Sequence, residues 1–157
     1  MSNPDFVYTT YIKSTPERVW AAITNPEFVR QYWTPDIVSD WKKGSKWQMY
    51  ADAEKKMAHV GGRVLESDPP KRLVLTWVDI SDPTDESNVT FALDAVEDMV
   101  RLVVSHTGFK DQSIIAGRIS AGWPRVLSSL KSLLETGRAL DTWAGHAGDC
   151  GKQPAAA

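Results

Sequence analysis

The fold is decided by residues 114–137, which read IIAGRISAGWPRVLSSLKSLLETG. Apolar side chains recur in this segment at spacings of three, four and seven residues, and polar side chains fall on the opposite side. Gly137 is typical of the residue that follows a helix C-terminus. At 1.5 Å per residue the segment would be roughly 35 Å long, which matches a strand of about ten residues. We therefore predict one amphipathic helix from Ile114 to Gly137 that covers a sheet from end to end.

Pro124 lies in the middle of this predicted helix. Its ring nitrogen has no hydrogen to donate to the carbonyl of Ser120, and the ring crowds the preceding turn. Gly122 adds backbone freedom at the same place. We therefore predict a kink near Ser120 to Trp123, or a break after which Pro124 starts a new helix.

The N-terminal part of the chain predicts one strand and two short helices. Residues 6–12 alternate in character and are rich in β-branched and aromatic side chains, which is typical of a strand. Thr15-Pro16-Glu17 and Asn25-Pro26-Glu27 each combine an N-cap residue, a proline at the first helical position and an acid in the first turn. Pro35 should end the second helix.

Residues 36–106 change to a pattern of strands and turns. Six strands are expected, at 37–41, 46–50, 57–66, 72–78, 89–95 and 100–106, and the short turns between them favour antiparallel pairing. Gly61-Gly62 predicts a bulge or sharp curvature within the third of these strands. The acidic side chains of residues 79–86 are interpreted as a solvated loop. The predicted class is α+β, with a curved antiparallel sheet of about seven strands in the order β-α-α-β6-α.

Composition limits the domain organisation and the partners. One domain is expected over residues 1–140, and residues 141–157 carry little apolar pattern, so we expect a mobile tail there. The net charge of −2 and the lack of a dense Lys/Arg run argue against a nucleic-acid partner. No apolar run is long enough for membrane insertion, and the N-terminus lacks a signal-peptide pattern, so we expect a cytoplasmic protein. His146 and Cys150 lack two further ligands nearby, so we predict no metal site and no cofactor.

A curved sheet that holds a single helix often encloses an apolar cavity of roughly 300–1,000 Å³. The chain has seven tryptophans, which is a high number, and such rings usually line cores, pockets or interfaces. The alternative is that the same side chains fill the space as a solid core. The predicted lining residues are Trp33, Trp47, Met49, His59, Trp77, Phe91, Val104, His106, Trp123, Val126 and Leu130.

His59 and His106 are the titratable members of this set. In a cavity either one would hydrogen-bond a ligand or act as a general base. The alternative is a histidine held by a structural partner at the end of a strand. The sequence contains no nucleophile elbow, phosphate-binding loop, dinucleotide fingerprint or HExxH motif, so we assign no catalytic residues.

Two segments carry a resemblance to a known family: GGRVLESDPPKRLVLTW at residues 61–77 and GWPRVLSSLKSLLETG at residues 122–137. Together with the run from Thr15 to Trp20 and with Tyr32-Trp33, they resemble the START-like (SRPBCC) superfamily. Within it they are similar to bacterial members of the activator of Hsp90 ATPase homologue family. The resemblance spans about Phe6 to Gly137. It implies a helix-grip fold of the Bet v type with a hydrophobic cavity, a link to the stress response, and no shared catalytic set.

Three functions follow from these patterns. The leading hypothesis is a protein that binds a small hydrophobic or aromatic ligand between the last helix and the sheet. The alternatives are a cyclase, dehydratase or hydrolase that uses the same cavity, and a module that binds a chaperone. Eukaryotic namesakes activate the chaperone with an additional N-terminal domain, which we do not expect here because the first strand starts close to Met1. The sequence does not decide whether the protein forms a homodimer.

Overall fold

The computed structural model describes residues 5–33, 36–50 and 57–140. The predicted order of elements is confirmed: one strand, two short helices, six strands and a long helix. The elements are β1 (Phe6–Ile12), α1 (Pro16–Thr24), α2 (Pro26–Tyr32), β2 (Asp36–Ser39), β3 (Lys46–Tyr50), β4 (Ala58–Asp68), β5 (Arg72–Asp79), β6 (Ser87–Val96), β7 (Met99–Thr107) and α3 (Ile114–Thr136). The predicted tail, residues 141–157, lies outside the described residues.

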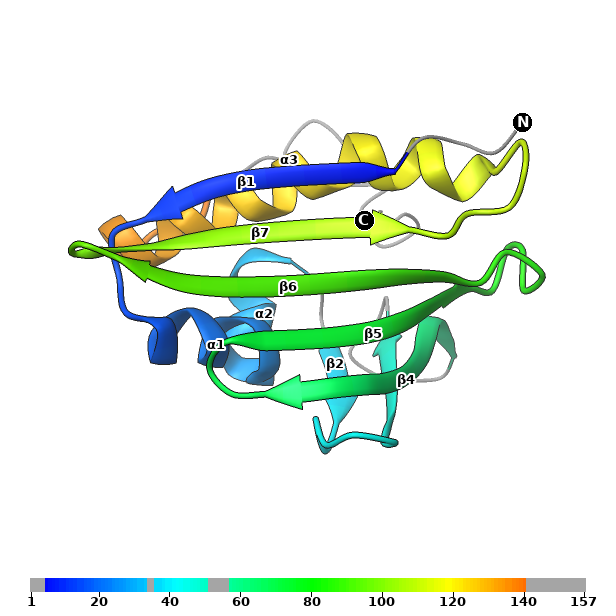
Figure 1. Ribbon diagram of the computed structural model, residues 1–157, viewed down its shortest axis with the longest axis horizontal. Helices are drawn as coiled ribbons and strands as arrows, with labels where there is room; N and C mark the ends of the chain where they lie inside the picture. The colour runs from blue at the N-terminus through cyan, green and yellow to red at the C-terminus, as the bar shows by residue number, and fades with distance from the viewer. Residues whose placement is uncertain (1–4, 34–35, 51–56, 141–157) are drawn as a thin grey trace.

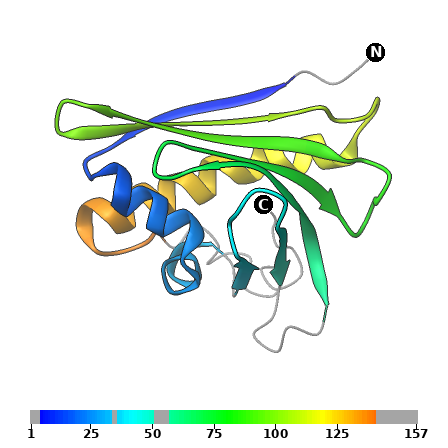
Figure 2. The same ribbon diagram turned by 60° about the horizontal axis from the view of Figure 1, so that its bottom comes forward.

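The seven strands form a single antiparallel sheet in the order β1-β7-β6-β5-β4-β3-β2. The first strand therefore pairs with the last, and α1 and α2 carry the chain from one edge of the sheet to the other. Figure 1 shows α3 running alongside β1 and β7, with α1 and α2 near one end of the sheet. Figure 2 shows that the three helices lie on the same face of the sheet. This is the predicted α+β helix-grip arrangement.

The core lies between this sheet face and α3. Every second residue of β7 is buried, from Val100 to His106, and the intervening residues are half-exposed. Helix α3 buries Ile115, Ile119 and Trp123 along the same stripe that its sequence period predicted. The buried apolar side chains form one connected cluster, which agrees with a single core in the described part of the chain.

The helix ends follow the local signals in the sequence. The Thr15 side chain accepts a hydrogen bond from the Arg18 amide at 3.3 Å, and the Asn25 side chain accepts one from the Glu27 amide at 2.9 Å. Gly137 ends α3 with a φ of 84°, a left-handed conformation that glycine adopts without steric cost.

The predicted break at Pro124 is wrong, because α3 continues without interruption from Ile114 to Thr136. Trp123 and Val126, on either side of the proline, are both buried in the same core. Their packing offsets the one backbone hydrogen bond that the proline removes. The predicted kink stays a prediction.

The predicted bulge at Gly61-Gly62 is also wrong, and the alternative, sharp curvature at these residues, stays a prediction. The register of β4 shifts instead opposite Met49 and Tyr50, and again between Val64 and Glu66. The glycines instead allow the neighbouring strands to approach closely. A Cβ on Gly62 would lie 2.2 Å from the carbonyl oxygen of Thr76, which is too close for any side chain at this position.

Candidate functional site

Aromatic rings from β3, β5 and β6, and from Trp33 just after α2, meet around Trp123 in the middle of α3. The centroid of its ring system lies 5.2 Å from that of Trp33 and 5.7 Å from those of Trp77 and Phe91. Trp47 adds a further ring, 5.3 Å from Trp77. Centroid separations in this range, with tilted or edge-on ring planes, are those that aromatic pairs favour. The tryptophans singled out from the sequence therefore form one cluster.

The structure brings together ten of the eleven predicted cavity residues. Trp33 is half-buried, and nine others are buried in the common core: Trp47, Met49, Trp77, Phe91, Val104, His106, Trp123, Val126 and Leu130. His59 does not join them. The neighbouring Val60 faces the core, and His59 lines a groove with Lys46 and Gln48 on the other side of the sheet. The register shift opposite Met49 and Tyr50 lies next to His59 and was not visible in the sequence.

The space left inside this cluster is small. It measures about 10 Å³, and its walls are Ile23, Trp33, Ile37, Trp41, Trp47, Leu75, Trp77 and Phe91. We call it the interior space. Such a volume suits one water molecule at most, whereas the sequence led us to expect several hundred cubic ångströms. The side chains around the interior space therefore pack as a nearly solid core in this conformation. Their role in ligand binding stays a prediction.

Four of these wall residues were missed from the sequence: Ile23, Ile37, Trp41 and Leu75. Ile23 and Leu75 lie on apolar stripes that could have been included. Trp41 shares the parity of Ile37 in the predicted strand 37–41, but β2 ends at Ser39 and Trp41 follows it. Its φ of 57° is an outlier for a bulky side chain, and its amide donates to the Ser39 hydroxyl at 2.9 Å. A half-buried ring on a strained backbone therefore forms one wall of the interior space.

The indole N–H groups of the three fully buried tryptophans differ in their partners. Trp47 donates to the Thr76 carbonyl at 2.8 Å, and Trp123 donates to Nδ1 of His106 at 3.1 Å. Trp77 Nε1 is buried and has no acceptor in the described part of the chain. An unpaired buried donor costs about 1–3 kcal/mol, so a hydrogen-bond acceptor placed beside Trp77 would be favoured.

His106 is fully buried and hydrogen-bonded through both ring nitrogens. Because an indole N–H can only donate, Nδ1 must accept from Trp123 and carry no proton. Nε2 then carries the hydrogen and donates to the Ser87 hydroxyl at 2.8 Å, a tautomer assigned from these partners. Burial lowers the pKa of His106 to about 3, so the ring is neutral near pH 7. His106 is therefore held by structural partners, as in the second of the two alternatives from the sequence. A general base would need a free ring nitrogen, and His106 has none.

Two polar residues of the interior were missed or misread. Ser87, at the start of β6, is fully buried and is the hydroxyl partner of His106. Asp85 is fully buried as well, so its interpretation as a solvated loop residue is wrong. Its carboxylate accepts from the Lys110 amide at 2.9 Å and from the Ser113 hydroxyl, which ties the β5–β6 loop to the start of α3. A run of acids gave no signal that one of them turns inward.

No group of three or more histidine, cysteine or acidic side chains is placed to hold a metal ion among the residues that the structure describes. None of the described helices combines the length and the apolar character needed to cross a membrane.

The comparisons with known proteins agree with the fold. The chain is similar to the Aha1 dimer from Colwellia psychrerythraea (TM-score 0.72, 21% identity, 87% of this chain and 100% of that chain covered). It is also similar to MLL2253 from Mesorhizobium loti (TM-score 0.72, 28% identity, 83% and 96% covered). A third similar structure is PFC0360w, described as an HSP90 activator from Plasmodium falciparum (TM-score 0.70, 21% identity, 83% and 95% covered).

The sequence matches none of the curated proteins with which it was compared. The family model described as "Activator of Hsp90 ATPase homolog 1-like protein" matches residues 13–135, which is most of the chain and covers the first segment that carried the resemblance and all but the last two residues of the second. The protein therefore belongs to the family of activator of Hsp90 ATPase homolog 1-like proteins.

Proposed function

We propose that this protein binds a small, ring-containing apolar molecule that carries a hydrogen-bond acceptor, and that the molecule occupies the interior space. The observation that supports the proposal is the indole N–H of Trp77, which has no acceptor among the described residues and lies in an otherwise apolar aromatic wall. A ligand carbonyl or ether oxygen would satisfy this donor, and its ring would pack against the surrounding tryptophans.

Binding requires the interior space to widen, because about 10 Å³ cannot hold a ring. Most of the wall is buried, but Trp33 and Trp41 are half-exposed, so solvent reaches the wall beside them. The strained backbone of Trp41 makes its side chain the better candidate to move, since leaving the left-handed region releases strain. The ligand then gains the apolar contacts that this ring gives up.

A pair of matched probes tests the acceptor. Acetophenone and ethylbenzene have similar shapes, but only acetophenone has an acceptor oxygen. NMR titration should show tighter binding of acetophenone, by roughly tenfold for one hydrogen bond to a buried donor. The Trp77 indole signal, assigned by its loss in Trp77→Phe, should move with acetophenone only. In Trp77→Phe the two probes should bind equally.

A second pair of variants tests the location. Leu75 lines the interior space, while the neighbouring Val74 is half-exposed and lies outside that wall. Leu75→Phe should abolish binding of both probes because it fills the space, and Val74→Phe should leave both affinities unchanged. Circular dichroism confirms that each variant is folded. Equal binding by Leu75→Phe and the wild type, or no preference for acetophenone in the wild type, would contradict the proposal.

A chaperone-binding role is the second candidate. It is favoured by the family description and by the similarity to PFC0360w, which is described as an HSP90 activator. The test is the ATPase rate of a purified Hsp90 with and without a molar excess of this protein. Acceleration would support the role, and an unchanged rate together with no complex on size-exclusion chromatography would exclude it. An enzyme in the interior has less support, because both ring nitrogens of His106 are already engaged.

A further inference from the structure

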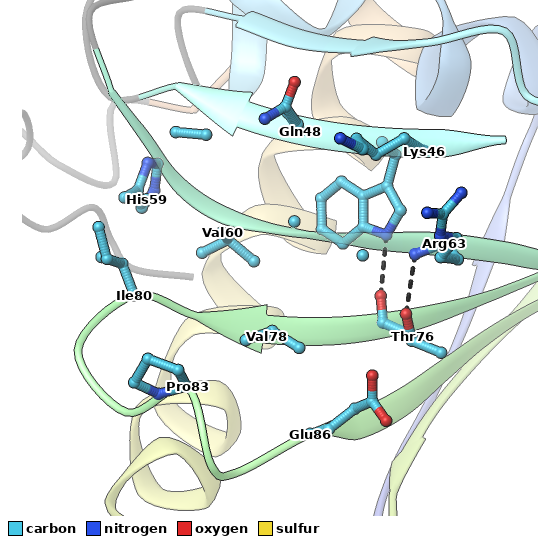
Figure 3. A pocket seen from close by; sticks show the side chains of 14 residues that line it. Lys46, Gln48, His59, Val60, Arg63, Thr76, Val78, Ile80, Pro83 and Glu86 are labelled. Carbon is cyan, nitrogen blue, oxygen red and sulfur yellow. Dashed lines mark hydrogen bonds between the residues drawn. The ribbon is translucent and has the colours of Figure 1, made fainter.

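A groove of about 440 Å³ lies on the face of the sheet that points away from α3. In β5, Thr76 and Val78 alternate with the buried Leu75 and Trp77, so their side chains point to the opposite face. Figure 3 shows the groove with side chains from β3, β4 and β5 and from the β5–β6 loop around it. It is therefore separate from the interior space.

Two glycines of β4, Gly61 and Gly62, line the groove. A Cβ on Gly61 would lie 2.9 Å from the Trp47 carbonyl oxygen, and one on Gly62 would lie 2.2 Å from the Thr76 carbonyl oxygen. Any larger residue would push the strands apart, so β4 passes through the groove without side chains at these positions. Trp47 lines both the groove and the interior space.

The two ends of the groove differ in chemistry. Lys46 and Arg63 lie at one end, and Ile80 and Pro83 lie at the other. Neither Lys46 nor Arg63 forms an ion pair within the described residues, and the Arg63 guanidinium donates a 3.3 Å hydrogen bond to the Gly44 carbonyl. Ile80 is 49% exposed although it is apolar. Glu86 is the acidic member of the lining.

We propose that this groove is a second binding site, which takes a small anionic amphiphile such as an aryl or alkyl carboxylate. Its anionic group would lie between Lys46 and Arg63, where neither cation has a carboxylate partner among the described residues and arginine offers paired N–H donors. Its apolar part would cover Val78 and Ile80. The volume suits a small molecule rather than a macromolecular interface.

The experiment compares naphthalenecarboxylate with naphthalenecarboxamide, which has nearly the same shape and no charge. Backbone amide shifts are followed by NMR during titration of the whole protein. The carboxylate should shift the signals of Gln48, Arg63 and Val78, with a dissociation constant on the order of 1 mM for a ligand of this size. The carboxamide should bind about tenfold more weakly. Added salt should weaken the binding of the carboxylate only.

Two double variants change the net charge equally and so separate a site from a general field effect. Lys46→Gln with Arg63→Gln removes the proposed anion contacts and should weaken carboxylate binding about tenfold. Lys42 and Lys43 lie in the nearby turn, outside the lining. The double variant Lys42→Gln with Lys43→Gln should therefore leave the affinity for the carboxylate unchanged. Equal weakening by both pairs would overturn the proposal, as would shifts confined to Trp77, Phe91 and Trp123. Absence of shifts at about 10 mM probe would overturn it too.

Discussion

Nδ1 of His106 accepts a hydrogen bond from the indole N–H of Trp123 at 3.1 Å, which connects the last strand of the sheet to the middle of α3. The other ring nitrogen binds Ser87 at the start of β6. One neutral histidine therefore joins three elements through fully buried hydrogen bonds. The arrangement works only while Nδ1 has no proton, and this condition makes the stability of the fold depend on pH.

Acid should destabilise the protein through His106. The ordinary pKa of the side chain is 6.5, and burial lowers it to about 3 in the folded state. Between these values the unfolded chain binds a proton that the folded chain does not. This contribution to stability is therefore complete above about pH 6.5 and is lost as the pH falls towards 3, by up to roughly 5 kcal/mol. Urea unfolding of the wild type and of His106→Gln at several pH values isolates this slope from that of the carboxylates. Parallel pH profiles would contradict the prediction.

Ser87→Ala should lower the free energy of unfolding by about 1–3 kcal/mol, because the His106 Nε2 hydrogen would lose its acceptor inside the core. Ser105→Ala is the matched control. Ser105 precedes His106 in β7 and lies on its half-exposed side, so the same change should stay within about 0.5 kcal/mol. Denaturant unfolding of both variants checks the difference. Equal losses of unfolding free energy in the two variants would mean that the hydrogen bond between Ser87 and His106 does not stabilise the fold.

Gly62→Ala should be strongly destabilising, whereas Gly117→Ala should stabilise. A Cβ on Gly62 would overlap the backbone of Thr76 at 2.2 Å, and a backbone cannot move aside cheaply. We expect a loss of about 3 kcal/mol or more. Gly117 has no atom within 4 Å of its would-be Cβ and lies in α3, so alanine should add about 0.5–1 kcal/mol. Thermal unfolding checks both, and a neutral Gly62→Ala would argue against close approach as the role of this glycine.

These residues also show where prediction from the sequence ends. Thr15, Asn25 and Gly137 act on backbone groups within a few residues, so the sequence pattern alone located the helix ends. Gly62 and Asp85 act on residues that are distant in the chain. Gly62 must be a glycine because the Thr76 backbone of the next strand lies so close to it, and Asp85 accepts a hydrogen bond from Ser113 at the start of α3. Such pairings depend on the register and the loop path, which a single sequence does not encode locally.

The candidate site follows the same division. Alternation in the strands identified most of the rings that meet at Trp123, because inward parity is a local property. The size of the interior space was not predictable in this way. It depends on how Trp33 and Trp41 close the wall, and both follow the ends of regular elements. Whether aromatic side chains line a cavity or fill it is decided by tertiary packing.

Glu135→Ala should loosen the C-terminal end of the β1 edge strand. The Glu135 carboxylate accepts from the Lys13 amide at 2.8 Å and from Lys131, whose ammonium group also donates to the Tyr11 carbonyl at 2.6 Å. Helix α3 thus occupies polar backbone groups at the strand edge. We expect amide hydrogen exchange at Lys13 to accelerate about tenfold, with no change at Thr9 in the middle of β1. In Glu135→Gln, which keeps an acceptor, the exchange rate at Lys13 should lie between those of the wild type and Glu135→Ala.

Trp41→Gly should speed the association of acetophenone with the interior space. Glycine adopts a φ of 57° without strain, and its lack of a side chain removes the half-buried ring from the wall. If Trp41 limits access, the association rate constant should rise about tenfold or more, measured by NMR line shapes. Trp41→Phe keeps a ring at the same place and should change the rate far less. An unchanged rate in Trp41→Gly, with binding otherwise intact, would locate the access route beside Trp33 instead, because that is the other half-exposed ring of the wall.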